Sequence, residues 1–408
     1  MKQDMKQDMQ QEMEQVCEVL RERVLNCMDL GRELGDEELR ELIVRELVQI
    51  QDTIGLSIKK RLYVEQRVFN SLRKLDILQN LLEDETVTEI MVNGPKEVYF
   101  EKNGSFHKYP HVFTSEEKLQ DVIQQIVGRH NRVVNLSSPI VDTRLEDGSR
   151  VNVVLYPIAI DGSAISIRKF SKKALDINDL IEKETLSKEV ADFLKELVVS
   201  RYNLFISGGT SSGKTTFLNA LSSFIPKGER IITIEDSAEL QLQGIKNIVR
   251  LETRSRNTEG VQAITARELI HTALRMRPDR IIVGECRGEE ALDMLQAMNT
   301  GHDGSLSTGH ANSTQDMLNR LETMVLMGME LPLTAIRQQI ASGIDVLIHL
   351  ERGCDQKRRV VEISEVLGVK NGVIRLQKLY TYENGWKKRA ELQRREKLRN
   401  REEMVNGL

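Results

Sequence analysis

The chain has 408 residues, of which 40% are hydrophobic and 29% are charged, and its formal net charge is −4. This length allows two or three domains with sizeable cores, and the near balance of charge gives no general argument for binding a nucleic-acid backbone. Cys17, Cys27, Cys286 and Cys354 form no C-x-x-C pair, which argues against a disulfide framework and against a zinc module. The N-terminus is too polar for a signal peptide, and no apolar stretch is long enough to cross a bilayer. We therefore expect a soluble, cytoplasmic protein that reaches a membrane only through partners.

Residues 1–75 are charged and rich in Leu and Val, which indicates a helical N-terminal extension. Apolar residues recur there at roughly helical spacing, so we expect two or three amphipathic helices that form a bundle or a docking element. A coiled coil is the alternative, but the heptads are not sustained enough to favour it. The residues that carry the pattern are Leu39, Leu42, Ile43, Leu47 and Ile50.

Residues 78–172 have the pattern of a separate α+β domain, with short strands around one helix. The turn signals between its strands are Asn93-Gly94 and Asn103-Gly104. Thr114 followed by Glu117 fits a capping box and predicts where the helix begins. Residues 173–189 are expected to be a linker.

Strands and helices alternate over residues 190–380, which is typical of a parallel, doubly wound α/β sheet. The predicted buried strands have the sequences LFIS, IITIE, RIIVGE and VLIHLE. Asn371-Gly372 predicts an antiparallel hairpin at the end of this region. Residues 381–408 form a highly charged tail, for which we expect a helix that is solvated or lies at an edge.

The segment FISGGTSSGKTT matches G-x-x-x-x-G-K-[ST], the phosphate-binding loop, and it stands between an apolar strand and an amphipathic helix. Glycines let the backbone turn its N–H groups toward phosphate oxygens, and the start of the helix adds a positive dipole end. Lys214 would supply a point charge to the β- and γ-phosphates, and the Thr215 hydroxyl would bind Mg²⁺. The alternative is a chance Gly/Ser-rich turn. The residues of the loop are Gly208, Gly209, Thr210, Ser211, Ser212, Gly213, Lys214, Thr215 and Thr216.

The loop alone does not identify the nucleotide. ATP is favoured because the chain has no N-K-x-D segment, the usual reader of guanine, and it also lacks an LSGGQ signature. Adenylate or nucleoside kinases stay open on the loop alone.

Carboxylates follow two of the predicted strands: Glu235, Asp236 and Glu239 after one, and Glu285 after another. The carboxyl ends of parallel strands meet at one edge of a sheet, so these acids are expected to converge on the loop. One could complete the Mg²⁺ shell and another could orient the attacking water. The alternative is that they are helix caps or solvated loop residues, and for Glu235 and Asp236 the two interpretations are balanced.

The segment NTGHDGSLSTGHANS contains His302 and His310 and is too polar for a core strand by its composition. A metal site there is weakly supported, since Asp303 is the only other obvious ligand between the two histidines. A flexible loop in which His310 senses phosphate or stabilises transition-state charge is the better interpretation. The alternative is a histidine with a purely structural hydrogen bond.

Together with RLEDGSRVN, the segments GGTSSGKTT, IEDSAEL, RIIVGECRGEE and the histidine segment resemble the type II/type IV secretion ATPase superfamily, and most of all its CpaF-like, or Tad pilus assembly, ATPases. The resemblance covers about residues 78–380. It implies a RecA-like ATPase domain that uses ATP and Mg²⁺, preceded by a smaller N-terminal domain, in a hexameric ring. Such a ring would power pilus assembly or protein secretion through inner-membrane platform proteins.

The resemblance also implies roles for single residues. Glu239 matches the catalytic base, Glu285 ends an atypical Walker B strand and would serve the metal with Thr215, and His310 belongs to the histidine box. Arg150 and Arg168 are the best matches to arginines that reach the phosphates, with Arg144 less certain; surface ion pairing is the alternative for all three. A DNA-transfer motor of the same superfamily and an ATP-binding scaffold without turnover are the rival functions. We expect no nucleic-acid partner, because aromatic residues make up only 4% of the chain and offer few stacking platforms.

Overall fold

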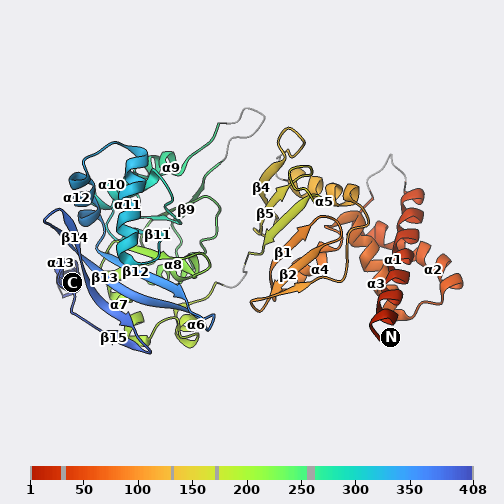
Figure 1. Ribbon diagram of the computed structural model, residues 1–408, viewed down its shortest axis with the longest axis horizontal. Coiled ribbons are helices and arrows are strands. Elements are labelled where there is room, and N and C mark those ends of the chain that lie inside the picture. Colours follow the sequence, from red (N-terminus) through yellow and green to blue (C-terminus); the bar gives the residue numbers. More distant parts are fainter. Residues whose placement is uncertain (1, 29–33, 130–132, 171–173, 255–261, 407–408) are drawn as a thin grey trace. The chain divides into compact units, whose positions relative to one another are not determined.

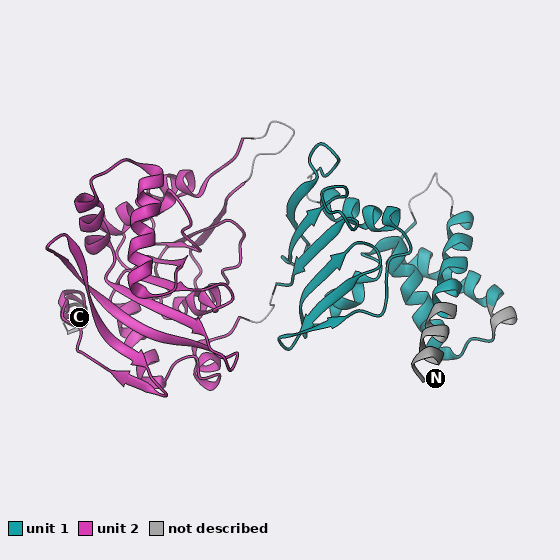
Figure 2. Cartoon of the chain, in the orientation of Figure 1, with its two compact units in different colours: residues 1–171 teal, residues 172–408 magenta. Residues whose placement is uncertain are grey.

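The computed structural model describes residues 2–28, 34–129, 133–170, 174–254 and 262–406 (Figure 1). The chain divides into two compact units, residues 1–171 and 172–408 (Figure 2). They are called the N-terminal unit and the C-terminal unit below. No helix in the described ranges is long and apolar enough to cross a membrane.

Three helices open the N-terminal unit, as the helical spacing predicts. Leu39, Ile43, Leu47 and Ile50 are all buried and form one core with residues of the other two helices. The extension is joined to the rest of its unit by polar contacts as well, because Glu14 lies 3.0 Å from the His111 ring nitrogen. The helices are α1 (Lys2–Cys27), α2 (Asp36–Ile54) and α3 (Ile58–Arg73).

An antiparallel sheet forms the rest of the N-terminal unit, with strand order β3-β2-β1-β6-β5-β4. Alternate residues of its strands, such as Val151 and Val153, are buried, and the buried face packs against a helix. The elements are α4 (Leu78–Glu83), β1 (Val87–Asn93), β2 (Val98–Lys102), β3 (Ser105–Lys108), α5 (Glu116–Gly128), β4 (Ile140–Arg144), β5 (Arg150–Val154) and β6 (Ala164–Arg168).

The cap of helix α5 differs from the expected one by one residue. Ser115, not Thr114, is the N-cap, and its hydroxyl accepts a hydrogen bond from the Lys118 amide. Both residues have the hydroxyl that a cap needs, so the sequence pattern alone could not choose between them. Asn103 and Gly104 form the two-residue turn between β2 and β3, with positive φ values of 53° and 76°, as predicted.

The C-terminal unit contains a nine-stranded sheet with the order β15-β14-β13-β12-β7-β11-β10-β8-β9. The strands from β12 to β9 in this order run parallel, and β13 to β15 extend the sheet antiparallel beyond β12. The hairpin predicted at Asn371-Gly372 joins β13 to β14. The strands are β7 (Leu204–Gly208), β8 (Ile231–Glu235), β9 (Ile248–Glu252), β10 (Arg280–Val283), β11 (Leu306–His310), β12 (Val346–Arg352), β13 (Arg358–Lys370), β14 (Val373–Tyr382) and β15 (Trp386–Lys388).

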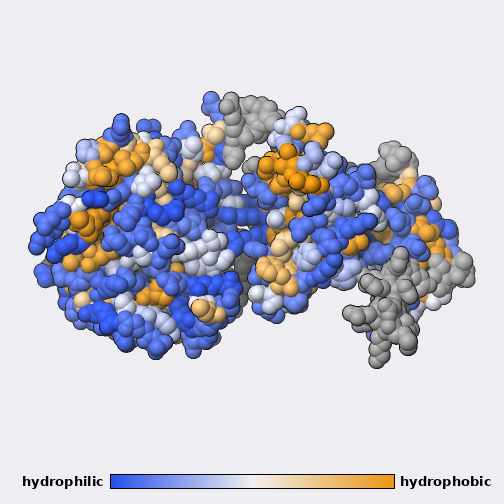
Figure 3. All heavy atoms as spheres, viewed as in Figure 1, coloured by the Kyte–Doolittle hydropathy of each residue, from blue (hydrophilic) through white to orange (hydrophobic). Residues whose placement is uncertain are grey.

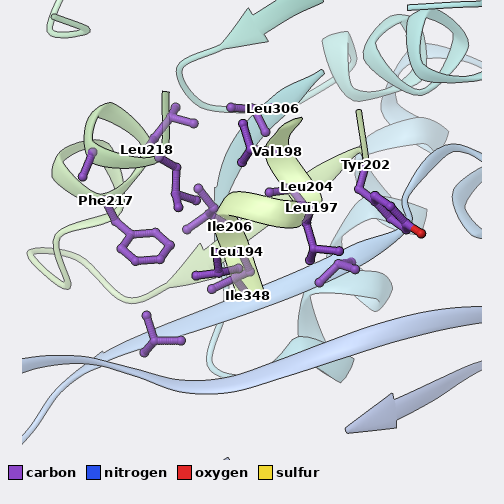
Figure 4. Packing of buried hydrophobic residues seen from close by; sticks show 14 of the residues in the cluster. Leu194, Leu197, Val198, Tyr202, Leu204, Ile206, Phe217, Leu218, Leu306 and Ile348 are labelled. Atoms are coloured by element: carbon purple, nitrogen blue, oxygen red, sulfur yellow. The ribbon is translucent and has the colours of Figure 1, made fainter. Parts of the chain in front are cut away.

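Helices cover both faces of this sheet. Leu204 and Ile206 of β7 point into one apolar cluster and Phe205 into the other, as the alternation of a strand requires. The first cluster packs around the helices that precede and follow β7 (Figure 4). The helices are α6 (Ile177–Glu182), α7 (Lys188–Val199), α8 (Lys214–Ser222), α9 (Ala266–Ala273), α10 (Glu290–Asn299), α11 (Thr314–Gly328), α12 (Leu333–Gly343) and α13 (Glu396–Asn406).

Three expectations differ from the structure in this unit. Residues 173–189, expected to be a linker, contain α6 and the first turn of α7, and Leu180 and Leu186 are buried in the core. The histidine segment, judged too polar for a core strand, supplies the buried strand β11 between β7 and β10. The charged tail is helical only from Glu396, and the residues before that helix are docked on the sheet.

Buried carboxylates hold the docked part of the tail in place. Glu365, 1% exposed, accepts hydrogen bonds from the backbone amides of Gln393 and Arg394 at 2.9 and 2.7 Å. Lys397 bridges Asp345, 3% exposed, and Asp303 at 2.7 and 2.6 Å. Composition alone could not show these long-range partners, which hold the tail on the sheet.

Removing residues 390–408 should therefore destabilise the C-terminal unit. The truncation removes both amide donors of the tail from Glu365 and leaves Asp345 with the Asn203 amide but without Lys397, and breaking buried pairs of this kind costs about 3 kcal/mol. For a unit of this size we expect the melting temperature to fall by about 6–12 °C in a thermal scan. A truncation that removes only residues 401–408 is the matched control and should change the melting temperature little. Equal melting temperatures for all three proteins would contradict the assignment.

Candidate functional site

The predicted phosphate loop lies between β7 and α8, at the carboxyl end of the parallel strands. Its glycines are required by geometry: a Cβ on Gly208 would lie 2.4 Å from the carbonyl oxygen of Leu350, and Gly213 has a φ of 92°. Ser211 also has a positive φ, 59°. The loop thus holds the compact, left-handed turns that aim backbone N–H groups at an anion.

Lys214 is the first residue of α8, and its ammonium group reaches back over the loop. It donates hydrogen bonds to the carbonyl oxygens of Gly208 and Gly209 at 3.0 and 2.9 Å, and its Nζ lies 3.2 Å from Nδ1 of His310. Burial lowers the pKa of Lys214, and the negative charge of Glu285 opposes that shift. The side chain is therefore aimed at the loop and electrostatically connected to an acid on a neighbouring strand.

His310, the last residue of β11, links Lys214 to Glu285. Its Nε2 lies 2.8 Å from Oε1 of Glu285. Burial lowers the pKa of His310, Glu285 raises it, and Lys214 lowers it further. A neutral ring can accept from the ammonium at Nδ1. Nε2 lies close to Glu285, but Oε1 of that carboxylate has no hydrogen-bond partner among the described residues. His302, in contrast, precedes β11 at the other end of the strand, and the structure does not bring it to the loop.

Glu285 and Asp236 follow the adjacent strands β10 and β8 and share one cation. Arg287 donates to Oε2 of Glu285 at 2.7 Å and lies 3.3 Å from Oδ2 of Asp236. The hydrogen bond to Glu285 is the main cause that raises the pKa of Arg287, and the charges of Asp236 and Glu239 add to it. The acids that follow β8 and β10 are thus brought together, as the parallel sheet predicted.

Glu235 and Glu239 have different places in the same turn. Glu235 is 6% exposed, and its Oε1 accepts hydrogen bonds from the amides of Glu239 and Leu240, both at 2.9 Å. Glu235 therefore shapes the turn that presents Glu239. Asn219 of α8 fixes the turn from the other side by accepting from the Gln241 amide at 2.9 Å.

The donor set near the loop suits magnesium rather than a metal held by protein alone. Within the described ranges, no group of three or more His, Cys, Asp and Glu side chains is arranged to hold a metal ion. The Thr215 hydroxyl at the start of α8 and the Glu285 and Asp236 carboxylates are oxygen donors. Mg²⁺ commonly takes one or two such ligands together with phosphate oxygens and waters, so these residues fit it.

A cavity of about 420 Å³ opens beside the loop. Its walls come from α6 and the residues after it, from the loop and the start of α8, and from the hairpin between β12 and β13. Lining residues include Leu180, Thr185, Gly213, Phe217 and Arg358. The mixture of apolar walls and a few polar groups is typical of a small-molecule pocket.

The three candidate arginines belong to the N-terminal unit, where they form a row across neighbouring strands. Arg144 of β4 pairs in register with Arg150 of β5, and Arg150 pairs with Arg168 of β6. Arg168 also lies 3.3 Å from Glu89 of β1. The strand order thus brings together three arginines that are scattered in the sequence. They form a row across one end of β4, β5 and β6, and such a row can bind a polyanion.

Two arginines of the site were missed from the sequence. Arg287 lies two residues after Glu285, which follows a predicted strand. A positive charge so close to a candidate acid could have indicated that Arg287 belongs to the site. Arg358 begins β13, and its Nε donates to the Ser211 carbonyl at 2.9 Å. That contact joins residues 147 positions apart, so no local pattern could have indicated it.

Comparison with known proteins agrees with this architecture. A putative conjugal transfer protein of Mycobacterium tuberculosis is 33% identical over 294 residues, which are 71% of this chain and 83% of that protein. The type IV secretion system protein PtlH of Bordetella pertussis is 32% identical over 316 residues, 71% of this chain and 93% of that protein.

Solved structures show the same fold at lower identity. The ATPase DotB of Legionella pneumophila is 22% identical with a TM-score of 0.50, over 70% of this chain and 78% of that one. The pilus retraction motor PilT with bound ADP is 19% identical with a TM-score of 0.51, over 82% of this chain and 88% of that one. The fold of the C-terminal unit is thus RecA-like. The model of the family described as "Type II/IV secretion system protein" matches residues 71–402, and the chain belongs to that family.

Proposed function

We propose that the chain is an ATPase that hydrolyses ATP to ADP and phosphate. The observation that carries this proposal is the connected set of Lys214, His310 and Glu285 at a loop built to hold phosphate. Lys214 neutralises the β- and γ-phosphates, His310 senses the γ-phosphate, and Glu239 orients and deprotonates the attacking water. Thr215 and Glu285 would hold Mg²⁺, which neutralises charge that develops on the phosphates.

The base and ribose are proposed to occupy the cavity beside the loop, because it is continuous with Gly213 and has apolar walls. The arginine row of Arg144, Arg150 and Arg168 is proposed to add positive charge to the phosphates. Support for the row comes from its register across β4, β5 and β6, which places the three arginines side by side.

We further propose that the work of the ATPase is pilus assembly of the Tad type, or protein secretion, across the cytoplasmic membrane. The protein would act in the cytoplasm as a homohexamer and associate peripherally with inner-membrane platform proteins. Membership of the secretion family and the resemblance of its motifs support this. No described helix spans a membrane, so the link to a platform would be through protein contacts.

Self-assembly is supported by an apolar patch on the N-terminal unit, near the start of edge strand β4. Apolar side chains gather on the surface there (Figure 3). The strand pairs only with β5, so its outer edge is available among the described residues. The patch consists of Val133, Leu136, Ile140, Tyr156, Ile158 and Ile160, whose exposed fractions run from 44% at Val133 to 84% at Ile160. Patches of this kind commonly mark protein interfaces.

Replacing Ile158 and Ile160 together by aspartate should break the assembly. Each side chain is worth about 1.5–3 kcal/mol when buried at an interface, so association should weaken by more than about 100-fold. Light scattering after size exclusion, at micromolar protein, should show a fall from oligomer to monomer. Phe106→Asp is the control, because Phe106 is 65% exposed on the opposite edge strand β3. An unchanged oligomer in the double variant would exclude the patch from the interface.

The function itself is tested by calorimetry of the purified protein with ADP and magnesium, followed by phosphate release from ATP. Absence of nucleotide binding would overturn the proposal. A DNA-transfer motor is the second candidate, since the chain is 33% identical to a putative conjugal transfer protein. Single-stranded DNA that raises the ATPase rate and binds with a steep salt dependence would favour that candidate. No effect of DNA would favour protein or pilin transport.

A further inference from the structure

Arg287 stands at the centre of the acidic part of the site, although no motif assigns it a role. It lies in the connection between β10 and α10, and its guanidinium spans from Glu285 to Asp236 at 2.7 and 3.3 Å. Asp236 in turn lies 3.2 Å from the Thr253 hydroxyl, so its carboxylate is oriented on both sides. One cation therefore joins the loops that follow two adjacent strands.

The two oxygens of Glu285 differ in their surroundings. Oε2 accepts from Arg287, whereas Oε1 lies 2.8 Å from Nε2 of His310 but has no hydrogen-bond partner among the described residues. A metal ion that takes Glu285 as a ligand needs at least one of these oxygens. His310 connects Glu285 to Lys214 and the phosphate loop, whereas Arg287 connects Glu285 to Asp236.

Arg287 is also the group best able to move. Its side chain is 58% exposed, whereas that of Glu285 is 19% exposed and that of His310 is 35% exposed. A long, half-solvated guanidinium can leave its partners for water at small cost, because exposed ion pairs contribute about 0–1 kcal/mol. The half-buried carboxylate of Glu285, in contrast, gains from a nearby cation.

We propose that Arg287 is an internal counter-ion that occupies the Glu285–Asp236 carboxylates until magnesium arrives with the nucleotide, so that guanidinium and metal compete for Glu285. Arg287 is then a positioning residue: it keeps both carboxylates in place, and it would move aside when the metal binds. The inference rests on the proposed function, since it concerns the metal of the same nucleotide site.

A purely structural role for Arg287 predicts the opposite change in magnesium affinity. If Arg287 held the two loops together throughout the cycle, its removal would let the carboxylates separate and would weaken the binding of magnesium. If Arg287 competes with the metal, its removal leaves two adjacent negative charges without a counter-ion, and magnesium binds more tightly. The sign of the change therefore separates the two roles.

The experiment is a calorimetric titration of MgCl₂ into the full-length protein saturated with ADP. We expect Arg287→Gln to bind magnesium about tenfold more tightly than the wild type, because a competing positive charge has been removed. Arg287→Lys retains the charge without the planar fork and should lie between the two. Arg267→Gln is the matched control: Arg267 also bridges two carboxylates, Glu289 and Asp293, each at 3.1 Å, and its loss should leave magnesium affinity unchanged.

Two further readouts keep the result interpretable. The affinity for ADP in EDTA should be the same in wild type and Arg287→Gln, which shows that the loop is folded. Steady-state ATPase should reach half its rate at a lower magnesium concentration in Arg287→Gln. Unchanged or weaker magnesium binding in Arg287→Gln overturns the inference but leaves the ATPase proposal standing. Failure of the wild type itself to bind ADP overturns the proposed function instead.

Discussion

Lys214→Ala should reduce kcat/KM for ATP hydrolysis by about 10³-fold or more, the effect expected when a preorganised charge is removed from a developing anion. The structure supports a large effect because the ammonium group is already placed over the loop by the Gly208 and Gly209 carbonyls and by His310. It needs no large reorganisation to meet a phosphate. Burial also lowers the pKa of Lys214, which reports a partly dehydrated ammonium that interacts strongly with an incoming charge.

The measurement is phosphate release at saturating magnesium, with binding of ADP followed separately. Lys195→Ala is a suitable control, since Lys195 is exposed on α7 and away from the loop. The melting temperature of Lys214→Ala should be measured beside its activity, because the lost bond to the Gly208 carbonyl is buried and the bond to the Gly209 carbonyl is only partly buried. If Lys214→Ala hydrolysed ATP at the wild-type rate, the loop would be an ordinary turn and not a nucleotide site.

The phosphate loop could be found from the sequence because all of its determinants are local. One short segment contains an apolar strand, glycines where the backbone turns and a lysine that begins a helix. Each of these features has a definite role in the geometry of the loop. The convergence of Glu285 with the residues after β8 was also accessible, since it follows from a general property of parallel sheets. In both cases, a local pattern or a general rule of the fold was enough to identify residues that lie close together in space.

Strand β11 shows why the hydropathy of a segment does not always predict a buried strand. Its Ser307 and Thr308 are buried, yet each hydroxyl has a partner: Thr308 donates to the Gly284 carbonyl at 2.7 Å, and Ser307 lies 3.3 Å from the Cys286 sulfur. Gly309 leaves room for a neighbour, because a Cβ there would lie 2.9 Å from the Met317 methyl. Polar and small residues can fill a central strand when distant partners satisfy them, and those partners are invisible in a local window.

The same reason explains the missed parts of the site. Arg358 reaches the loop from a hairpin far along the chain, and the tail is anchored by Glu365, which is buried in β13. Both contacts depend on the strand order of the folded sheet. For Glu235 the sequence left a site role and a cap role balanced, and its hydrogen bonds to two backbone amides depend on the folded turn.

Glu239→Gln should retain ATP binding and lower kcat by about 10²–10⁴-fold, the usual contribution of a positioned general base. The reason is that the amide preserves the shape of the side chain but can no longer accept a proton from water. KM should change little, since Glu239 is proposed to contact the attacking water and not the ground-state phosphates. The measurement is a single-turnover assay beside calorimetric binding of ATP.

Glu235→Gln is the informative comparison, because Glu235 and Glu239 lie in the same turn and both have a carboxylate side chain. Glu235 accepts from two backbone amides while almost fully buried, so its amide variant should lower the melting temperature as well as the activity. Glu239→Gln should lower activity alone, since its side chain is only half-buried and the turn is held by Glu235 and Asn219. If Glu239→Gln hydrolysed ATP at the wild-type rate, another group would have to position the water. If it lost stability like Glu235→Gln, its effect on activity could not be assigned to chemistry.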